Sequence, residues 1–285
     1  MSVNVARMPG PPDFRVPAAQ LTIDLDGAAP GDTVRRWFAA GFDDLGGELA
    51  ARVRAGASGR DDRTPGVVAA SLLAGDGLDV GWSASAWQRF LRIAATVPAL
   101  AALEIRTNDE RGRPARPFLS ISCTQPTDDS RWRILTFEHD DPAVADTALL
   151  RYLRSAAELS NPSYGEISFT SRLYQSALET GLALLPQDTV PRSRRIARGY
   201  AWVTVLAQEL GDRLGGAGGL LASGAFTEVA PLTGGGFWLR STEHWRSYGP
   251  AEALRVFRAL APVLPPGRPS ATASANPLAG EDAGG

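Results

Sequence analysis

Lysine is absent from this sequence, and cysteine and histidine are scarce. The 29 lysine-plus-arginine residues of the 285-residue chain are all arginines, and 31 acidic residues leave a formal net charge of −2. A nearly neutral chain has no overall electrostatic attraction to nucleic acid or to an acidic membrane surface. The composition therefore predicts no nucleic-acid partner and no membrane partner.

Cys123 is the only cysteine, so no disulfide can form within the chain. It ends the apolar segment FLSISC, a setting that favours a small buried side chain over a catalytic thiol. Apolar runs of about 18 residues, as a membrane-spanning helix requires, are also missing. The first residues lack the apolar core of a signal peptide, so we expect a soluble, cytoplasmic protein.

The patterns along the chain predict two loose ends around a folded body. Residues 1–17 are rich in proline, and residues 265–285 have almost no large apolar side chains. Ordering such segments costs conformational entropy with little burial in return, so we expect a disordered arm and a disordered tail. The folded body divides into an N-terminal half, 18–160, and a C-terminal half, 161–264.

The two halves share an order of elements. WRILTFEHDDPAVADTALLRYLRS and FWLRSTEHWRSYGPAEALRVFRAL each run from a tryptophan-bearing strand through Glu-His and Pro-Ala to an amphipathic helix. Alternation also predicts strands at 103–107 and 118–123, and helical spacing predicts helices beginning at Asp32 and at Ser83 or Ser85. The predicted fold class is α+β, with two related halves of antiparallel sheet and helices packed on one face.

Six glycines lie in GDRLGGAGGLLASG, residues 211–224. A phosphate-binding loop follows a strand and opens a helix, and its Walker form needs a lysine. These glycines instead follow a short predicted helix in a chain without lysine. We interpret Gly215 and Gly216 as a helix cap and Gly218 and Gly219 as a turn, rather than as a nucleotide site.

The two histidines support an enzyme as an alternative interpretation. Glu138-His139 and Glu243-His244 each place a carboxylate beside an imidazole at the end of a predicted strand. Such pairs suit a transition metal or acid–base catalysis. No HxH or HExxH spacing accompanies them, and strand ends commonly carry polar residues. We therefore predict no metal and no cofactor, and a metal-dependent or acid–base enzyme built on these four residues stays open.

Another set of polar and aromatic residues suits protein binding. The segment SNPSYGEIS has no nucleophile-elbow pattern, and the arginine run PRSRRIARGY is typical of a solvated loop that can contact an acidic partner. Two tryptophans lie in turn-like contexts, and exposed aromatics near arginine are typical of binding hot spots. The candidate binding residues are Tyr164, Glu166, Trp82, Trp245, Arg194 and Arg195.

The C-terminal half resembles a bacterial family of type VI immunity proteins. The likeness rests on ARGYAWVTVLAQELGDRLGG, GGGFWLRSTE and LAPVLPPG, together with PSYGEI at 162–167. The resemblance implies an α+β protein that binds and neutralises a partner's toxin, and it carries no catalytic residues. We therefore predict a non-enzymatic, immunity-like protein that neutralises a toxin or effector partner by surface complementarity. The sequence predicts neither the partner's identity nor the oligomeric state.

Overall fold

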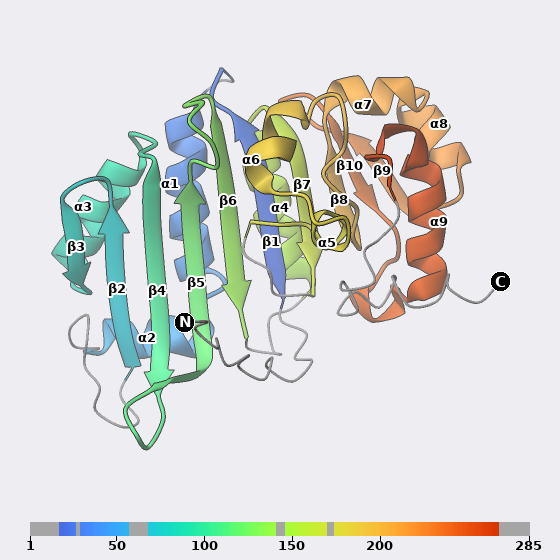
Figure 1. Cartoon of the computed structure of the whole chain (residues 1–285). Helices are drawn as coiled ribbons and strands as arrows, with labels where there is room; N and C mark the ends of the chain where they lie inside the picture. The colour runs from blue at the N-terminus through green and yellow to red at the C-terminus, as the bar shows by residue number, and fades with distance from the viewer. Residues whose placement is uncertain (1–16, 27–28, 57–67, 141–145, 170–173, 268–285) are drawn as a thin grey trace, which may run out of the picture.

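The computed structural model describes residues 17–26, 29–56, 68–140, 146–169 and 174–267. They form one ten-stranded sheet in the order β3-β2-β4-β5-β6-β1-β7-β8-β10-β9, in which neighbouring strands are antiparallel (Figure 1). The strands are β1 (Ala18–Asp24), β2 (Val68–Ala74), β3 (Leu78–Gly81), β4 (Leu100–Asn108), β5 (Pro114–Thr124), β6 (Trp132–His139), β7 (Pro162–Ser168), β8 (Val203–Leu206), β9 (Glu228–Pro231) and β10 (Phe237–Arg240). The predicted arm and tail lie almost wholly outside the described residues.

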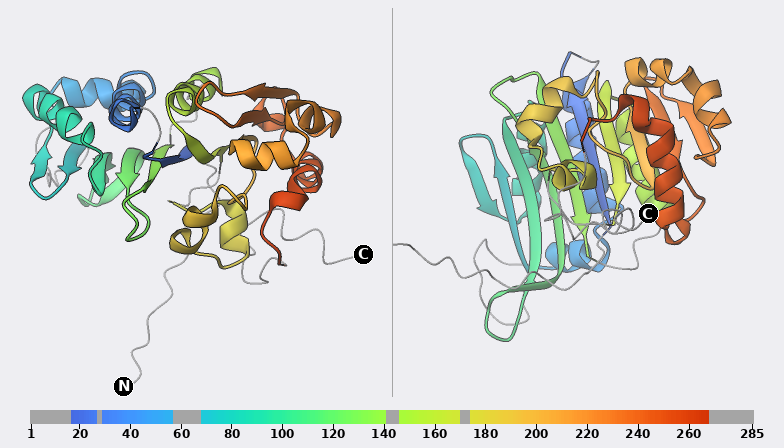
Figure 2. Two further views of the ribbon diagram at one scale, coloured as in Figure 1. Left: turned by 90° about the horizontal axis from the view of Figure 1, so that it is seen from above. Right: turned by 45° about the vertical axis from the view of Figure 1, so that its right-hand side comes forward.

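Nine α-helices within the described ranges pack against this sheet, which confirms the predicted α+β class. We call the face toward the viewer in Figure 1 the front face, and the opposite one the back face. Helices α1 to α4 lie behind the sheet, whereas α5 and α6 lie in front of β6, β1 and β7, and α7 and α9 lie in front of β8 and β10 (Figure 1 and Figure 2). The helices are α1 (Pro30–Asp43), α2 (Gly47–Arg54), α3 (Ala84–Ala94), α4 (Asp146–Glu158), α5 (Ala177–Gly181), α6 (Pro186–Thr189), α7 (Gln208–Arg213), α8 (Gly216–Ala222) and α9 (Pro250–Leu260).

The sheet is continuous across the predicted boundary at residue 160, because β7 pairs with β1 along its length. The single-face packing predicted for each half describes β2, β4 and β5, which have α1 to α3 behind them. The strands of the C-terminal half have helices on both faces, although α4, on their back face, comes from residues before 160. Leu149 and Leu153 of α4 join the core behind the sheet, whereas Val256 and Leu260 of α9 pack in front of it. The division into 18–160 and 161–264 stays a prediction.

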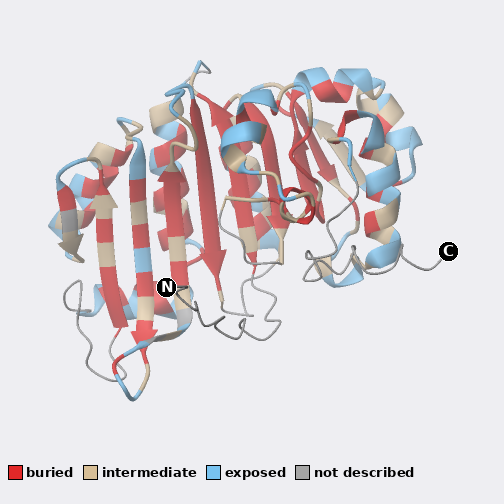
Figure 3. Cartoon of the chain, in the orientation of Figure 1, coloured by how far each residue is buried: buried red, intermediate tan, exposed pale blue. Residues whose placement is uncertain are grey.

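Alternation along β4 shows how the sequence sorts its side chains between the two faces. Ala101, Leu103 and Ile105 are buried against the helices of the back face. Leu100 and Glu104, which point to the front because side chains alternate along a strand, are exposed (Figure 3). Within the described ranges, no helix or strand lies over the front of β2, β4 and β5 (Figure 1), and we call this surface the open face.

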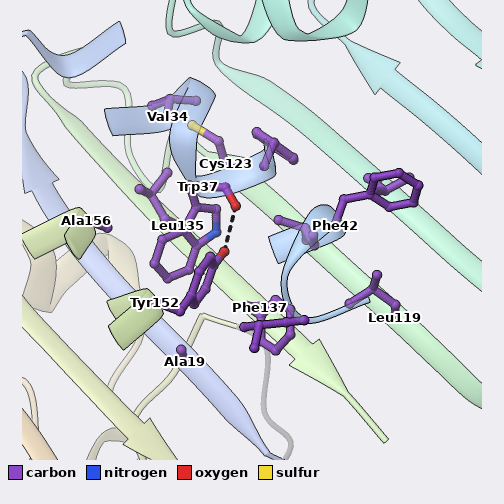
Figure 4. Packing of buried hydrophobic residues seen from close by; sticks show 14 of the residues in the cluster. Ala19, Val34, Trp37, Phe42, Leu119, Cys123, Leu135, Phe137, Tyr152 and Ala156 are labelled. Atoms are coloured by element: carbon purple, nitrogen blue, oxygen red, sulfur yellow. Dashed lines mark hydrogen bonds between the residues drawn. The ribbon is translucent and has the colours of Figure 1, made fainter. Parts of the chain in front are cut away.

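The main core holds the sheet to α1 and α4 (Figure 4). Trp37 is buried, its Nε1 donates to the carbonyl oxygen of Thr136 at 3.0 Å, and its ring lies 4.4 Å from that of Tyr152. The Tyr152 hydroxyl in turn donates to the carbonyl oxygen of Trp37 at 2.8 Å. Cys123 is fully buried here, and burial raises the pKa of its thiol to about 12, as expected of a structural cysteine.

The structure can be compared with several predictions about helix ends and glycines. Ser83 caps α3 by accepting a hydrogen bond from the amide of Ala86 at 3.1 Å, as predicted. The predicted helix from Asp32 is two helices, α1 and α2. Gly215 and Gly216 adopt φ values of 86° and 64° at the start of α8, but Gly218 and Gly219 lie within that helix rather than in a turn. The Pro-Ala pair at 142–143, predicted to precede the amphipathic helix of the N-terminal half, lies outside the described residues.

Candidate functional site

The structure distributes the candidate binding residues over separate parts of the molecule. Trp82 is half-buried, with its ring 4.6 Å from that of Phe42. Trp245 is half-buried as well, stacked 3.9 Å from the ring of Phe169. Neither tryptophan is fully exposed, because each has an aromatic neighbour of its own.

The two adjacent arginines differ in their surroundings. Arg194 is largely buried, with its guanidinium nitrogens 3.3 Å from the carboxylate of Asp24 and 3.2 Å from that of Glu209. Arg195 is exposed. Arg194 thus ties the front of the sheet to its own loop, and Arg195 is the one of this pair that offers its charge to solvent.

The Glu-His pairs are divided between the interior and the surface. Glu138 and His139 are both buried, but successive side chains of β6 point to opposite faces, so the two do not share a site. Glu243 and His244 are exposed, and the Nδ1 atom of His244 lies 3.7 Å from the Asp146 carboxylate. Within the described ranges, no group of three or more His, Cys, Asp or Glu side chains is placed to hold a metal ion.

A charged network is buried on the front face beneath α5, and Arg198 is its centre. The Nε and Nη2 atoms of Arg198 donate to the two carboxylate oxygens of Glu179 at 2.8 and 3.0 Å, and neither side chain is exposed. Its Nη1 donates to the hydroxyl of Thr22 at 2.6 Å, and Nη2 also donates to the carbonyl oxygen of Tyr174 at 2.6 Å. The guanidinium therefore joins β1 to α5 through a bidentate, fully desolvated ion pair.

Tyr164 and Glu166, the predicted binding residues of β7, belong to the same network. The Tyr164 hydroxyl donates to the Glu166 carboxylate, and the Arg198 guanidinium lies 5.4 Å from the Tyr164 ring centroid. Burial raises the pKa of Glu166 to about 7. Both side chains are inside the molecule, so this arrangement holds the helices to the sheet and presents neither residue to a partner.

Arg198 is the member of this network that sequence reasoning missed. It was interpreted as part of a solvated arginine run, yet the structure buries it completely. Its position in the sequence is no reliable signal, because Arg131 likewise directly precedes a strand, WRILTFEH, and its side chain is 44% exposed. A buried arginine needs an acidic partner, and Glu179 supplies it here.

The open front face carries a row of polar residues across four strands. Register places Ser71 of β2 beside Glu104 of β4, Glu104 beside Ser120 of β5, and Ser120 beside Glu138 of β6. A cavity of about 430 Å³ lies over this row. Its lining residues are Glu104, Ile105, Arg106, Ala115, Arg116, Phe118, Leu119, Ser120 and Glu138.

Glu138 is the buried member of that row. It is 6% exposed, and burial raises the pKa of its carboxyl to about 7. Desolvation is the sole cause of the shift: no hydrogen bond or ion pair from the described residues offsets it. The carboxyl is therefore close to half protonated near neutral pH, and a small electrostatic change moves it between the neutral and the charged form.

Raised carboxyl pKa values predict the direction of the pH dependence of stability. Glu138 and Glu166 keep their protons in the folded state between the ordinary pKa of 4.5 and the raised value of about 7, whereas the unfolded chain has lost them. The free energy of unfolding should therefore fall as the pH rises through this window. Urea denaturation at about pH 5 and about pH 8 measures the difference.

The Glu138→Gln variant measures how much of that pH dependence comes from Glu138. Glutamine does not ionise, so the variant should lose roughly half of the slope and should be more stable than the native protein at about pH 8. Glu243→Gln, at an exposed carboxyl, is the matched control and should leave the slope as it is. An unchanged slope in Glu138→Gln would contradict the burial effect described for this carboxyl.

Fold and site together define an α+β protein with one large antiparallel sheet, a helix-covered back and a partly open front. A solved structure with a similar fold is the T6SS protein PA0821 of Pseudomonas aeruginosa, with a TM-score of 0.56 and 10% sequence identity. The similarity covers 87% of this chain and 73% of that protein. At this identity the likeness shows the fold alone.

The other comparisons do not assign the chain to a protein family. No protein-family model matches the chain, and no curated protein matches it at a significant level. Among the described residues, none of the helices has the length and apolarity to cross a membrane. The functional interpretation therefore depends on the open face and its cavity.

Proposed function

We propose that this chain is a non-enzymatic, immunity-like protein of the cytoplasm that neutralises a toxin or effector partner by surface complementarity. The observation that carries the proposal is the open front of β2, β4 and β5. Two further points support it: the fold similarity to a T6SS protein, and the resemblance of the C-terminal half to type VI immunity proteins. Tyr164 and Glu166 serve the buried network in this proposal, so the contact surface is the front face.

The open face has the composition of a binding surface and the size of part of one. The nine residues of β4 span about 30 Å at about 3.4 Å per residue, and the three strands β2, β4 and β5 span roughly 10–15 Å. The resulting area, on the order of 400 Å², is about half of the share of about 800 Å² that each partner contributes to a standard interface. Leu100, 38% exposed, lies on the same face of β4 as Glu104 and Arg106, which gives the mixture of apolar and charged groups typical of non-obligate interfaces.

Co-expression with the products of the genes that flank this one tests the proposal, because a toxin among them should be relieved by the native chain. The native chain should restore growth and should co-elute with the toxin in size-exclusion chromatography. Leu100→Arg places a long charged side chain on the open face, and we expect it to weaken the complex at least about tenfold, which is about 1.4 kcal/mol.

Leu221→Arg provides a matched control, because Leu221 is an exposed leucine on α8, 57% exposed and remote from β4. It should bind the toxin as the native chain does. Equal weakening by both substitutions would place the contact elsewhere. Growth that stays inhibited and a complex that never forms with the native chain would reject toxin neutralisation itself.

A further inference from the structure

The Glu138 carboxyl combines two properties that are rarely found together. It is more than nine-tenths buried, and it lines a cavity that opens on the front face. A buried carboxyl that serves the fold is normally paired or hydrogen-bonded, as Glu179 is by Arg198. Glu138 has no such partner among the described residues, so the fold maintains a desolvated acid that its own described side chains do not neutralise.

The charged groups around the cavity leave Glu138 without a cationic partner among the described residues. Glu104 lies two strands from Glu138 in the same row, which places the backbones of the two residues roughly 10 Å apart across Ser120. Arg116, at the rim, already lies 3.3 Å from the Asp140 carboxylate, and Arg106 has an interaction of its own. Two carboxyls and two guanidinium groups thus line a largely apolar cavity. Of these four groups, Glu138 is the buried one, and no hydrogen bond or ion pair from the described residues offsets its desolvation.

We propose that this cavity, the Glu138 pocket, receives an arginine side chain of the partner protein, whose guanidinium pairs with the Glu138 carboxylate. This inference rests on the proposed function, because it assigns the partner's chemistry at the open face. A guanidinium is planar and weakly hydrated, so it enters a partly buried site at a lower desolvation cost than a lysine ammonium. A cavity of about 430 Å³ has room for a whole arginine side chain, and arginine is among the residues most often found at hot spots.

Binding in this pocket is coupled to a proton. In the free protein, a Glu138 carboxyl with a pKa of about 7 is largely protonated in mildly acidic solution. A guanidinium favours the carboxylate, so its binding releases that proton and lowers the pKa of Glu138. As the pH rises toward 7, the affinity should therefore increase by up to about tenfold per pH unit. Above pH 7 it should be constant.

The test uses short peptides, so it does not require the toxin. The probe is an N-acetylated, C-amidated Gly-Arg-Gly peptide, and its counterpart carries citrulline, which has nearly the same shape without the charge. A ¹³C NMR titration of the glutamate side chains follows the Glu138 carboxyl with and without each peptide. We expect the arginine peptide, at about 10 mM, to lower the pKa of Glu138 by about one unit or more, and the citrulline peptide to leave it unchanged.

Variants separate the pocket from general surface charge. Glu138→Gln should weaken arginine-peptide binding at least about tenfold and abolish its pH dependence, whereas Glu243→Gln should bind as the native protein does. Thermal unfolding at about pH 5, where the native carboxyl is neutral too, verifies that Glu138→Gln is folded. The pKa measurement on the native protein stands independently of any variant.

Two results would overturn the inference. One is equal binding of the arginine and citrulline peptides, and the other is a pKa of Glu138 that does not move at about 10 mM arginine peptide. Either result leaves the growth and co-elution experiments to decide the proposed function by themselves. Conversely, arginine-selective binding without toxin neutralisation would support the pocket and reject the proposed function.

Discussion

Replacing Arg198 with methionine is expected to lower the free energy of unfolding by about 3–5 kcal/mol. Methionine keeps much of the volume of the side chain but removes the charge that pairs with Glu179. Both residues are fully buried, so the variant leaves a carboxylate in the protein interior without its counter-ion. It also removes the donors to Thr22 and to the carbonyl oxygen of Tyr174. Urea denaturation monitored by tryptophan fluorescence measures the loss.

Two further variants make that result specific. Arg195→Met changes an exposed arginine of the same loop and should alter stability by less than about 0.5 kcal/mol. Adding Glu179→Gln to Arg198→Met removes the unpaired charge and should restore a part of the lost stability. A loss below about 1 kcal/mol in Arg198→Met would show that the ion pair does not hold α5 to the sheet in the way described.

Truncating Trp37 to alanine should cost about 3–5 kcal/mol, the range for large aromatic side chains in well-packed cores. The indole is buried between α1, the sheet and α4, and its Nε1 donor satisfies the carbonyl oxygen of Thr136. Alanine leaves a cavity beside Tyr152 and removes the indole donor to the carbonyl oxygen of Thr136. Thermal or urea unfolding, followed by circular dichroism, measures the change.

Phe257→Ala provides the comparison for Trp37→Ala, because Phe257 is an aromatic residue of α9 that is 39% exposed. Its truncation should cost about 1 kcal/mol or less. Trp37→Phe, which keeps most of the apolar volume but loses the donor, should fall between the two. Similar losses in Trp37→Ala and Phe257→Ala would contradict the central position assigned to the indole.

Local sequence patterns were enough to predict some elements of the fold. Strand β6 covers 132–139 as predicted, because WRILTFEH is a strand pattern bounded by polar turn residues. The hairpin of β2 and β3 was missed, since its alanine, glycine and leucine residues have little preference for strands. Helix α8 was missed for a similar reason: glycine is a poor helix former, and tertiary packing of Leu220 overrides that preference here.

The candidate site depended on contacts that no local pattern contains. Glu138 was chosen for its neighbour His139, but the alternation of β6 separates the pair, and the relevant neighbours of Glu138 are Ser120 and Glu104 on other strands. Tyr164 and Glu166 were chosen as binding residues, whereas pairing of β7 with β1 brings them under Arg198. Register between distant strands determines both outcomes, and a single sequence does not reveal that register.

The place of β1 in the strand order has a consequence for how the chain folds. It is the earliest of the described strands, yet Ala18 pairs with Glu138 on one side and with Ser168 on the other. A nascent chain must therefore carry this apolar segment without its neighbours until both later strands have emerged from the ribosome. Pairing between strands so far apart in the sequence is slow to form, and the unpaired segment is exposed to aggregation until that pairing is complete.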